Sequence, residues 1–265
     1  LARFEEVVKA ALSAGRTVHF LPPYRAEHVL KLQALGLLPA SPITPYNVGQ
    51  RGEAFIRAVV DMRNHKTPEE IEEIEKAVDI SVDMHCAMMR MVRPGIHEAE
   101  VRAAVTAIAQ QGGGDNSFPV IATTHGQTLH NHGYIHTAHD GDLFLLDAGA
   151  GHPVRDRTEQ REVPGHYCGD LSSTCPVGEQ FNERQQTIFN LCLHAHRTAV
   201  ATLAPGVPFR DVHFAACTAI AEGMKGLGLM KGDVHEAVAA GAHALFFPCG
   251  TGHMMGLDVH DMENL

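Results

Sequence analysis

The sequence lacks the segments that mark membrane-spanning and exported proteins. It contains no apolar run of about 18 residues, the length that a helix needs to cross a bilayer. The opening residues, Leu1 to Glu6, are not a basic stretch followed by an apolar core, so they do not form a signal peptide. The first residue is also not methionine, which suggests a fragment of a longer protein. We therefore expect no membrane as a partner.

Cysteine pairs and positive charge are also scarce. The six cysteines show no CxxC spacing, so we expect reduced thiols in a cytoplasmic protein; they are Cys86, Cys168, Cys175, Cys192, Cys217 and Cys249. Only 21 Lys and Arg stand against 31 Asp and Glu, which gives a net charge of -10. This balance argues against nucleic acid or an anionic membrane as the main partner.

Apolar residues are plentiful, at 45% of 265 residues, and allow one large domain plus part of another. Residues 1–46 are typical of the tail of an α/β domain, and a connecting helix follows them. The expected elements are helices at Phe4–Ala14, Ala26–Leu37 and Ala54–Arg63 and a short strand at Thr17–Leu21. So short a stretch buries little core by itself.

The clearest helix start is the run Thr67-Pro68-Glu69-Glu70. It offers an N-cap hydroxyl, a proline at the first helical position and a glutamate at the third. A stripe that is apolar except for His85 then keeps three- and four-residue spacing until Pro94-Gly95; its residues are Ile71, Ile74, Val78, Val82, His85, Met89 and Val92. This pattern predicts one long helix that buries that stripe.

A weak internal repeat appears when the chain is shifted by 111 residues. The shift lays Val92–Gly95 on Leu203–Gly206 and His85 on His196, two histidines that we expect to be core residues with hydrogen-bond partners. Each copy has a long helix, a Pro-Gly break, a second helix (Glu98–Gln110 or Phe209–Met224) and then strands. The expected strands are Phe118–Ala122, Asp142–Asp147 and Ala242–Pro248. The sequence therefore predicts an α+β domain with a curved antiparallel sheet backed by helices.

Three segments gather residues suited to a metal. Gly250–Asp261 places His253 and His260 seven residues apart among glycines and aliphatics. The run LLDAG delivers Asp147 at the end of a buried strand, and the run GDLSST offers Asp170. Two carboxylates and an imidazole favour a hard cation over a zinc–thiolate site.

These segments, GTGHMMGLDVHD, LLDAGA and GDLSSTCP, resemble those of the Xaa-Pro peptidases (aminopeptidase P and prolidase) of the pita-bread metallopeptidases. The resemblance covers about residues 60–265. It implies an α+β pita-bread fold with a pseudo-twofold repeat. On this basis residues 1–64 would be the C-terminal part of a creatinase-like α/β domain plus a linker helix, and 65–265 a catalytic domain that is incomplete at its C-terminus.

The resemblance also implies roles for individual residues. Asp147, Asp170 and His253 match metal ligands for two divalent ions, Mn²⁺ in the first place, with Co²⁺ or Zn²⁺ as alternatives. His130 and His260 match histidines that hold substrate and assist catalysis. The remaining matched position, Cys249, stands where many relatives have a substrate-binding histidine, and a thiol is a weak donor.

Two departures from the family pattern stand out. The family supplies two glutamate ligands from VEPG-like and RIED-like segments after GLDVHD, whereas this chain ends at Leu265 without them. We therefore expect the 265-residue chain alone to be inactive. In addition, 22 residues separate Asp147 from Asp170, about twice the family's usual number. The charged, proline-bounded run at 152–164 predicts a solvated hairpin extension.

The resemblance thus predicts a parent protein that hydrolyses Xaa-Pro bonds in proline-containing peptides and forms a homodimer. Two alternatives stay open at this point. One is a creatinase-like amidinohydrolase on the same fold, which does not need two metals. The other is a catalytically dead pita-bread domain that binds a partner.

Overall fold

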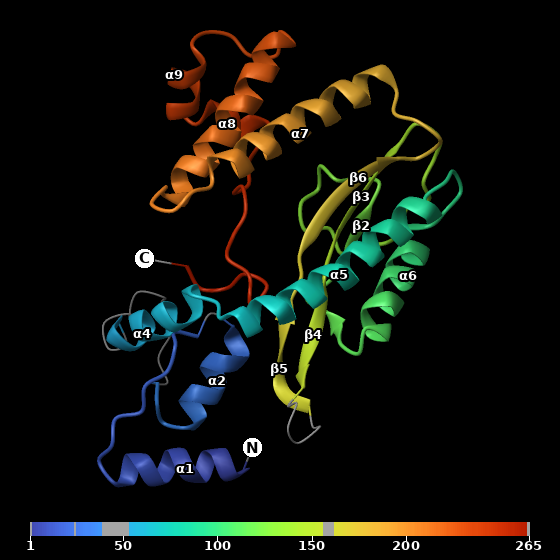
Figure 1. The fold of residues 1–265 in the computed structure, drawn as a ribbon. Coiled ribbons are helices and arrows are strands. Elements are labelled where there is room, and N and C mark those ends of the chain that lie inside the picture. The colour runs from blue at the N-terminus through green and yellow to red at the C-terminus, as the bar shows by residue number, and fades with distance from the viewer. Residues whose placement is uncertain (1, 24, 39–52, 156–161, 264–265) are drawn as a thin grey trace. The chain divides into compact units, whose positions relative to one another are not determined.

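The computed structural model describes residues 2–23, 25–38, 53–155 and 162–263 (Figure 1). The chain forms two compact units, one of Leu1–His65 with Met262–Leu265 and the other of Lys66–Asp261. Across the described ranges, no helix combines the length and the apolar character required to span a bilayer.

The smaller unit contains helices α1 (Ala2–Ser13), α2 (Ala26–Ala34) and α4 (Glu53–Asn64). The three helices expected here are confirmed to within a few residues at their ends. The strand expected at Thr17–Leu21 is wrong, because these residues have no regular structure. A strand needs a hydrogen-bonded neighbour, and the described residues of this unit offer none. Residues 39–52 of this unit lie outside the described residues.

The long helix α5 (Pro68–Met91) begins where the sequence predicts. Thr67 is its N-cap: its side-chain oxygen accepts from the Glu70 backbone N at 3.3 Å, and the Glu70 carboxylate accepts from the Thr67 backbone N at 2.8 Å. This capping box satisfies two donors that would otherwise lack partners at the helix start.

The buried face of α5, however, differs from the expected stripe. Ile71, Val82 and Met89 are 46%, 43% and 49% exposed. The buried face is instead formed by Ala77, Ser81, Met84, His85 and Met88. Small residues decide this face because the strands approach the helix backbone closely there: the Ala150 backbone N donates to Ser81 Oγ at 2.9 Å. A pattern that counts only large apolar side chains misses such a contact.

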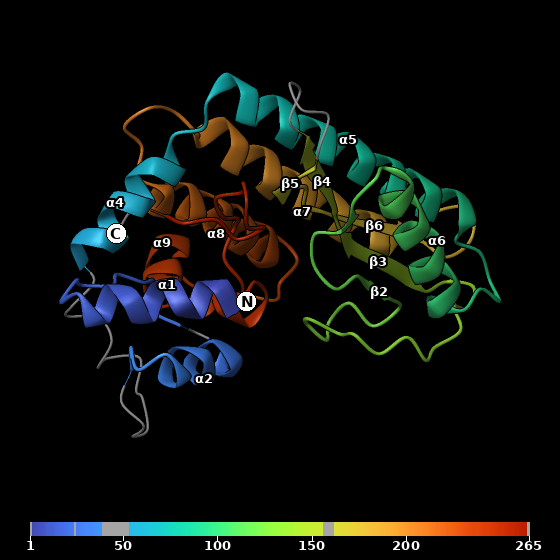
Figure 2. The same cartoon turned by 90° about the horizontal axis from the view of Figure 1, so that it is seen from below.

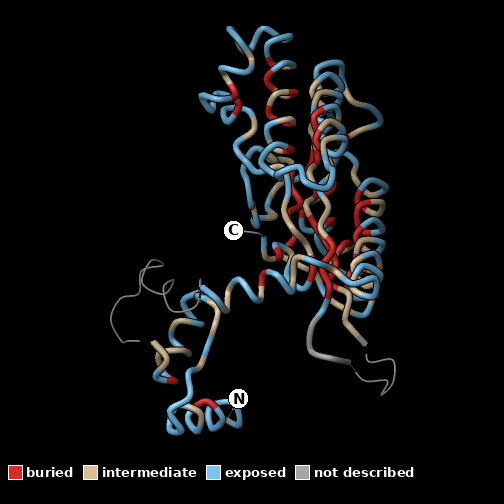
Figure 3. Tube along the Cα trace, turned by 60° about the vertical axis from the view of Figure 1, so that its left-hand side comes forward, coloured by how far each residue is buried: buried red, intermediate tan, exposed pale blue. Residues whose placement is uncertain are grey.

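Two antiparallel three-stranded sheets pack against α5 and α6 (Glu98–Gln111) (Figure 1, Figure 2). One sheet has the order β2-β3-β6, and the other β1-β4-β5. Their bounds are β1 Asp115–Asn116, β2 Ile121–Thr123, β3 Leu143–Ala148, β4 Ala150–Arg155, β5 Glu162–Cys168 and β6 Leu171–Pro176. Figure 3 shows buried residues along these strands, where Phe144 and Leu146 meet Met84, Met88 and Val101 in one core. The expected α+β layering of helices on a sheet is confirmed.

The internal repeat is confirmed by the helices of the second half, α7 (Glu183–Thr202) and α8 (Phe209–Gly226). α6 and α8 begin at Glu98 and Phe209, 111 residues apart. The breaks before them use glycines with positive φ, Gly95 at 91° and Gly206 at 85°. Positive φ is readily adopted only by glycine, so both copies turn the chain in the same way.

The second copy then departs from the first. After α8 come α9 (Val234–Ala239) and a short 3₁₀ helix, η2 (Ala242–Leu245), so the strand expected at Ala242–Pro248 is wrong. Among the described residues, no strand lies beside this segment to pair with it. His196 is exposed, so its expected place in the core is wrong too, while the burial of His85 is confirmed.

Candidate metal and substrate site

The sheet brings the two motif carboxylates together. In the β3–β6 pairing Asp147 lies opposite Ser172, and Asp170 immediately precedes β6. The 22 residues between the two aspartates contain the β4–β5 hairpin, in which His152 pairs with Tyr167. The expected hairpin is therefore confirmed, and residues 156–161 at its tip lie outside the described residues. A long excursion in sequence leaves the two carboxylates neighbours in space.

Two glycines make this close approach possible. A Cβ on Gly149 would lie 1.8 Å from the Gly169 carbonyl oxygen. A Cβ on Gly169 would lie 2.4 Å from Ser81 Oγ and 2.7 Å from the Ala77 carbonyl oxygen. Real Cβ atoms do not approach that closely, so a larger residue at position 149 would push apart the segments that carry Asp147 and Asp170, and one at position 169 would push the Asp170 segment away from α5.

We therefore expect Gly149→Ala to lower the free energy of unfolding by about 3 kcal/mol, the upper end of the usual range for overpacking. Gly226→Ala is the matched control, because a Cβ there meets nothing within 4 Å. Urea denaturation of both variants checks this. A loss in Gly149→Ala no larger than that in the control would contradict the close crossing of the strands.

The electrostatics at the aspartates favour a cation. Burial, and then the charge of Asp170, raise the pKa of Asp147, and a 3.0 Å hydrogen bond from Ser172 Oγ opposes them. Two neighbouring carboxylates repel each other unless a positive charge lies between them. The ionised form of Asp147 is therefore destabilised in this position, and a bound cation would remove that destabilisation.

The side chain of His253 points toward Asp170. Its Nδ1 lies 2.9 Å from the Met254 carbonyl oxygen and its Nε2 lies 3.0 Å from Asp170 Oδ2. A carbonyl only accepts, so the Nδ1–H donates to it, and Nε2 is the ring nitrogen directed at Asp170. A ring nitrogen this close to a carboxylate oxygen is joined to it either by a shared proton or by a metal ion that both atoms bind.

The segment that carries His253 is fixed to the sheet. The Cys168 backbone N donates to the Gly256 carbonyl oxygen at 2.8 Å, two residues before Asp170. At the far end, Asp261 is nearly fully buried and lies 3.3 Å from Lys66 Nζ. These contacts hold His253 beside Asp170, although the segment itself is neither helix nor strand.

His260 is the other expected site residue that lies with Asp170 and His253. The His260 ring stacks on His253 with 3.7 Å between centroids, and Asp170, His253 and His260 have ligand atoms within 4.8 Å of one another. His130 and Cys249 are exposed, and His130 has a φ of 52°. Within the described ranges, neither hydrogen-bonds to Asp170 or His253.

Two residues near the site carry no functional signal in the sequence. His85 lies beneath the carboxylates, with Nε2 3.0 Å from the Ala148 carbonyl oxygen and Nδ1 close to Ser173 Oγ. Glu98 is fully buried and tethers both ends of the loop that carries His130. One oxygen accepts from Thr123 and Thr124, and the other accepts from the His136 backbone N at 3.0 Å.

Comparison with known proteins decides the family. The model of metallopeptidase family M24 matches residues 72–265. The chain belongs to this family. Its Xaa-Pro aminopeptidase relatives include that of Escherichia coli, 32% identical over 207 residues, which are 77% of this chain and 44% of the relative. That of Haemophilus influenzae is 30% identical over 76% of this chain and 45% of the relative. The chain thus spans less than half the length of these proteins.

Solved structures agree with this assignment. Aminopeptidase PepP of Pseudomonas aeruginosa matches with a TM-score of 0.77 and 25% identity, over 98% of this chain and 58% of that one. Zinc-substituted E. coli aminopeptidase P in complex with product matches with a TM-score of 0.70 and 29% identity, over 90% and 50%. The expected α+β pita-bread fold is confirmed. As a metallopeptidase family, M24 uses divalent metal.

Proposed function

We propose that the protein to which this chain belongs hydrolyses Xaa-Pro peptide bonds with bound divalent metal. The observation that supports this most strongly is that His253 Nε2 lies 3.0 Å from Asp170 Oδ2, with Asp147 on the strand that pairs with β6. The names of the M24 relatives point to the same substrate class, peptides with proline after the scissile bond.

The residues present fit the metal. Asp147, Asp170 and His253 would hold it, and an oxygen-rich set with one imidazole suits Mn²⁺, Co²⁺ or Zn²⁺. When bound, the metal polarises the scissile carbonyl and lowers the pKa of water. The resemblance implies two ions and five ligands, so we propose that a polypeptide with only these three holds at most one ion and is inactive by itself.

The remaining motif residues would handle the peptide. Two histidines are proposed to hold the substrate and to stabilise negative charge on its scissile carbonyl. They are His260, which stacks on His253, and His130, which lies on the loop tethered by Glu98. Cys249 is proposed to line the substrate side. Glu98 contributes by limiting where His130 can move, because it fixes both ends of that loop.

The domain boundaries follow from the same proposal. Residues 1–64 are the C-terminal part of a creatinase-like domain with a linker helix, and 65–265 belong to the catalytic domain. A homodimer and a cytoplasmic location stay predictions from the sequence.

The activity is tested on the complete protein, with Ala-Pro and a longer Xaa-Pro-Xaa peptide as substrates. We expect hydrolysis that a chelator abolishes and added Mn²⁺ restores, because the carboxylates alone supply no electrophile. Creatine is the comparison substrate. Equal turnover in chelator would contradict the metal mechanism, and turnover of creatine without either peptide would support an amidinohydrolase instead.

A further inference from the structure

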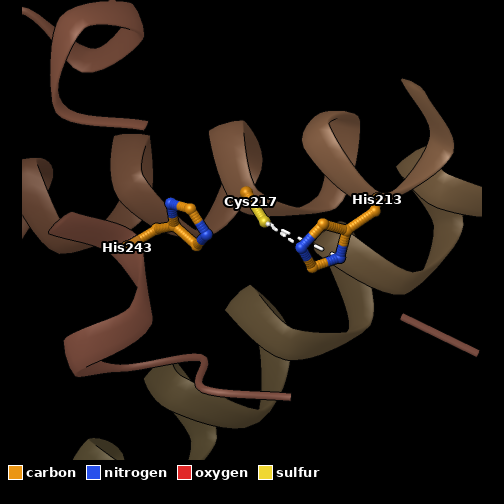
Figure 4. Close-up of side chains that lie close together, drawn as sticks. All are labelled: His213, Cys217 and His243. Atoms are coloured by element: carbon orange, nitrogen blue, oxygen red, sulfur yellow. Dashed lines mark hydrogen bonds between the residues drawn. The ribbon is translucent and has the colours of Figure 1, made fainter. Parts of the chain in front are cut away.

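A second group of metal-ligating side chains lies in the other half of the larger unit. His213 and Cys217 are four residues apart on α8 and therefore share one face of the helix, and His243 comes from η2, which packs on α8. Ligand atoms of all three lie within 4.8 Å of one another, and Cys217 Sγ is 3.4 Å from His213 Nε2. Figure 4 shows Cys217 between the two rings.

The three side chains are more buried than ordinary surface histidines and cysteines. Cys217 is fully buried and His243 is 8% exposed. His243 Nδ1 is buried and finds no hydrogen-bond partner among the described residues. A buried polar atom without a partner lowers the stability of the fold by about 1–3 kcal/mol, so stability alone does not explain the position of this imidazole. Burial also raises the pKa of the Cys217 thiol and lowers that of His213, on which the neighbouring His243 acts in the same direction.

His213 is already oriented as a ligand would be. Its Nδ1 lies 2.7 Å from Thr251 Oγ1, which leaves Nε2 directed at the Cys217 sulfur. Metal-bound histidines are commonly held in this way, with the second ring nitrogen bonded to a neighbouring group. Thr251 is two residues before His253, so this contact ties the cluster to the segment that carries the motif histidine.

We propose that His213, Cys217 and His243 form a second metal site, which takes a zinc-class ion and anchors the start of the His253 segment through Thr251. Two imidazoles and one thiolate are a borderline-soft set that favours Zn²⁺ or Co²⁺ over Mn²⁺. The thiol loses its proton to solvent as the sulfur binds, and water completes the shell. The proposal does not depend on the peptidase activity.

Titration of the chain with Co²⁺, a spectroscopic stand-in for Zn²⁺, tests the site. A thiolate ligand gives a near-ultraviolet charge-transfer band, whereas Asp147, Asp170 and His253 contain no sulfur. We expect the band in the unaltered chain and its loss on adding Zn²⁺. Cys217→Ser should abolish the band, and Cys192→Ser should keep it, because Cys192 is an exposed thiol on α7.

If Cys217 and His213 were only a hydrogen-bonded core pair, no such band would appear, and that result would overturn the proposal. A band that survives in Cys217→Ser would overturn it as well. Circular dichroism of each variant verifies that the fold is kept. Thr251→Val provides a second measurement: we expect the band to remain while Co²⁺ affinity falls about 10- to 100-fold, the usual effect of removing a group that orients a ligand. Unchanged affinity in Thr251→Val would contradict the anchoring role.

Discussion

Asp170→Asn is expected to weaken Mn²⁺ binding by more than about a hundredfold. Loss of a group that merely orients a metal ligand already weakens binding about 10- to 100-fold, and Asp170 is proposed as a ligand itself. Its carboxylate lies 3.0 Å from His253 Nε2 and acts on the pKa of Asp147. An amide removes the charge that the cation would neutralise. Mn²⁺ is the appropriate ion because the sulfur-containing cluster on α8 favours softer metals.

The matched control for that measurement is Cys249→Ser. Cys249 is exposed and makes no hydrogen bond to Asp170 or His253 in the part of the chain that the structure describes. We expect its Mn²⁺ affinity, measured by calorimetric titration, to stay within about twofold of the unaltered chain, since surface substitutions usually change little. Comparable losses in the two variants would mean that Cys249 belongs to the metal site or that Asp170 does not.

Glu98→Ala is expected to lower the free energy of unfolding by about 3 kcal/mol or more. The substitution strands hydrogen-bond donors of Thr123, Thr124 and His136, and each buried unsatisfied group costs about 1–3 kcal/mol. Glu222→Ala, an exposed glutamate on α8, is the control and should change stability by less than about 0.5 kcal/mol. Urea denaturation distinguishes the two. Equal losses would show that the Glu98 hydrogen bonds contribute little.

The same carboxylate predicts a pH dependence. Burial alone would raise the pKa of Glu98, but the hydrogen bonds from Thr124, His136 and Thr123 outweigh it and lower that pKa. A folded-state pKa below the unfolded value of about 4.3 means that the ionised group stabilises the fold above that pH. This stability is lost as the pH falls through the folded pKa. The difference between the unaltered chain and Glu98→Gln should therefore shrink in acid, and a constant difference would contradict the assignment.

The sequence predicts best what depends on local chemistry. The capping box at Thr67 and Glu70 and the Pro-Gly breaks at Gly95 and Gly206 are fixed by side chains a few residues apart. The hairpin between Asp147 and Asp170 is signalled by its charged, proline-bounded run. For these features the sequence carries the physical cause itself.

Features that depend on a partner elsewhere in the chain are harder to predict from the sequence. The strands expected at Thr17–Leu21 and Ala242–Pro248 fail because strand propensity does not supply a neighbouring strand. The buried face of α5 is set by Ala77 and Ser81, whose small size matters only once the strands lie against them.

In the candidate site, too, the sequence identifies the residues within motifs but not those whose role depends on remote contacts. Motifs single out Asp147, Asp170 and His253, because glycines and aliphatics surround each of them. The role of Glu98 as the tether of the His130 loop depends on Thr123 and His136, which are remote in sequence. The cluster of His213, Cys217 and His243 is hidden because its third member reaches the others only when η2 folds back on α8.

Anomalous diffraction at the manganese absorption edge, from crystals of the chain grown with Mn²⁺, locates the metal most directly. We expect a peak bounded by the carboxylates of Asp147 and Asp170 and by His253 Nε2. A Mn²⁺-bound crystal with no peak at these three side chains, or with its peak at His213, Cys217 and His243 instead, would contradict the metal centre proposed here.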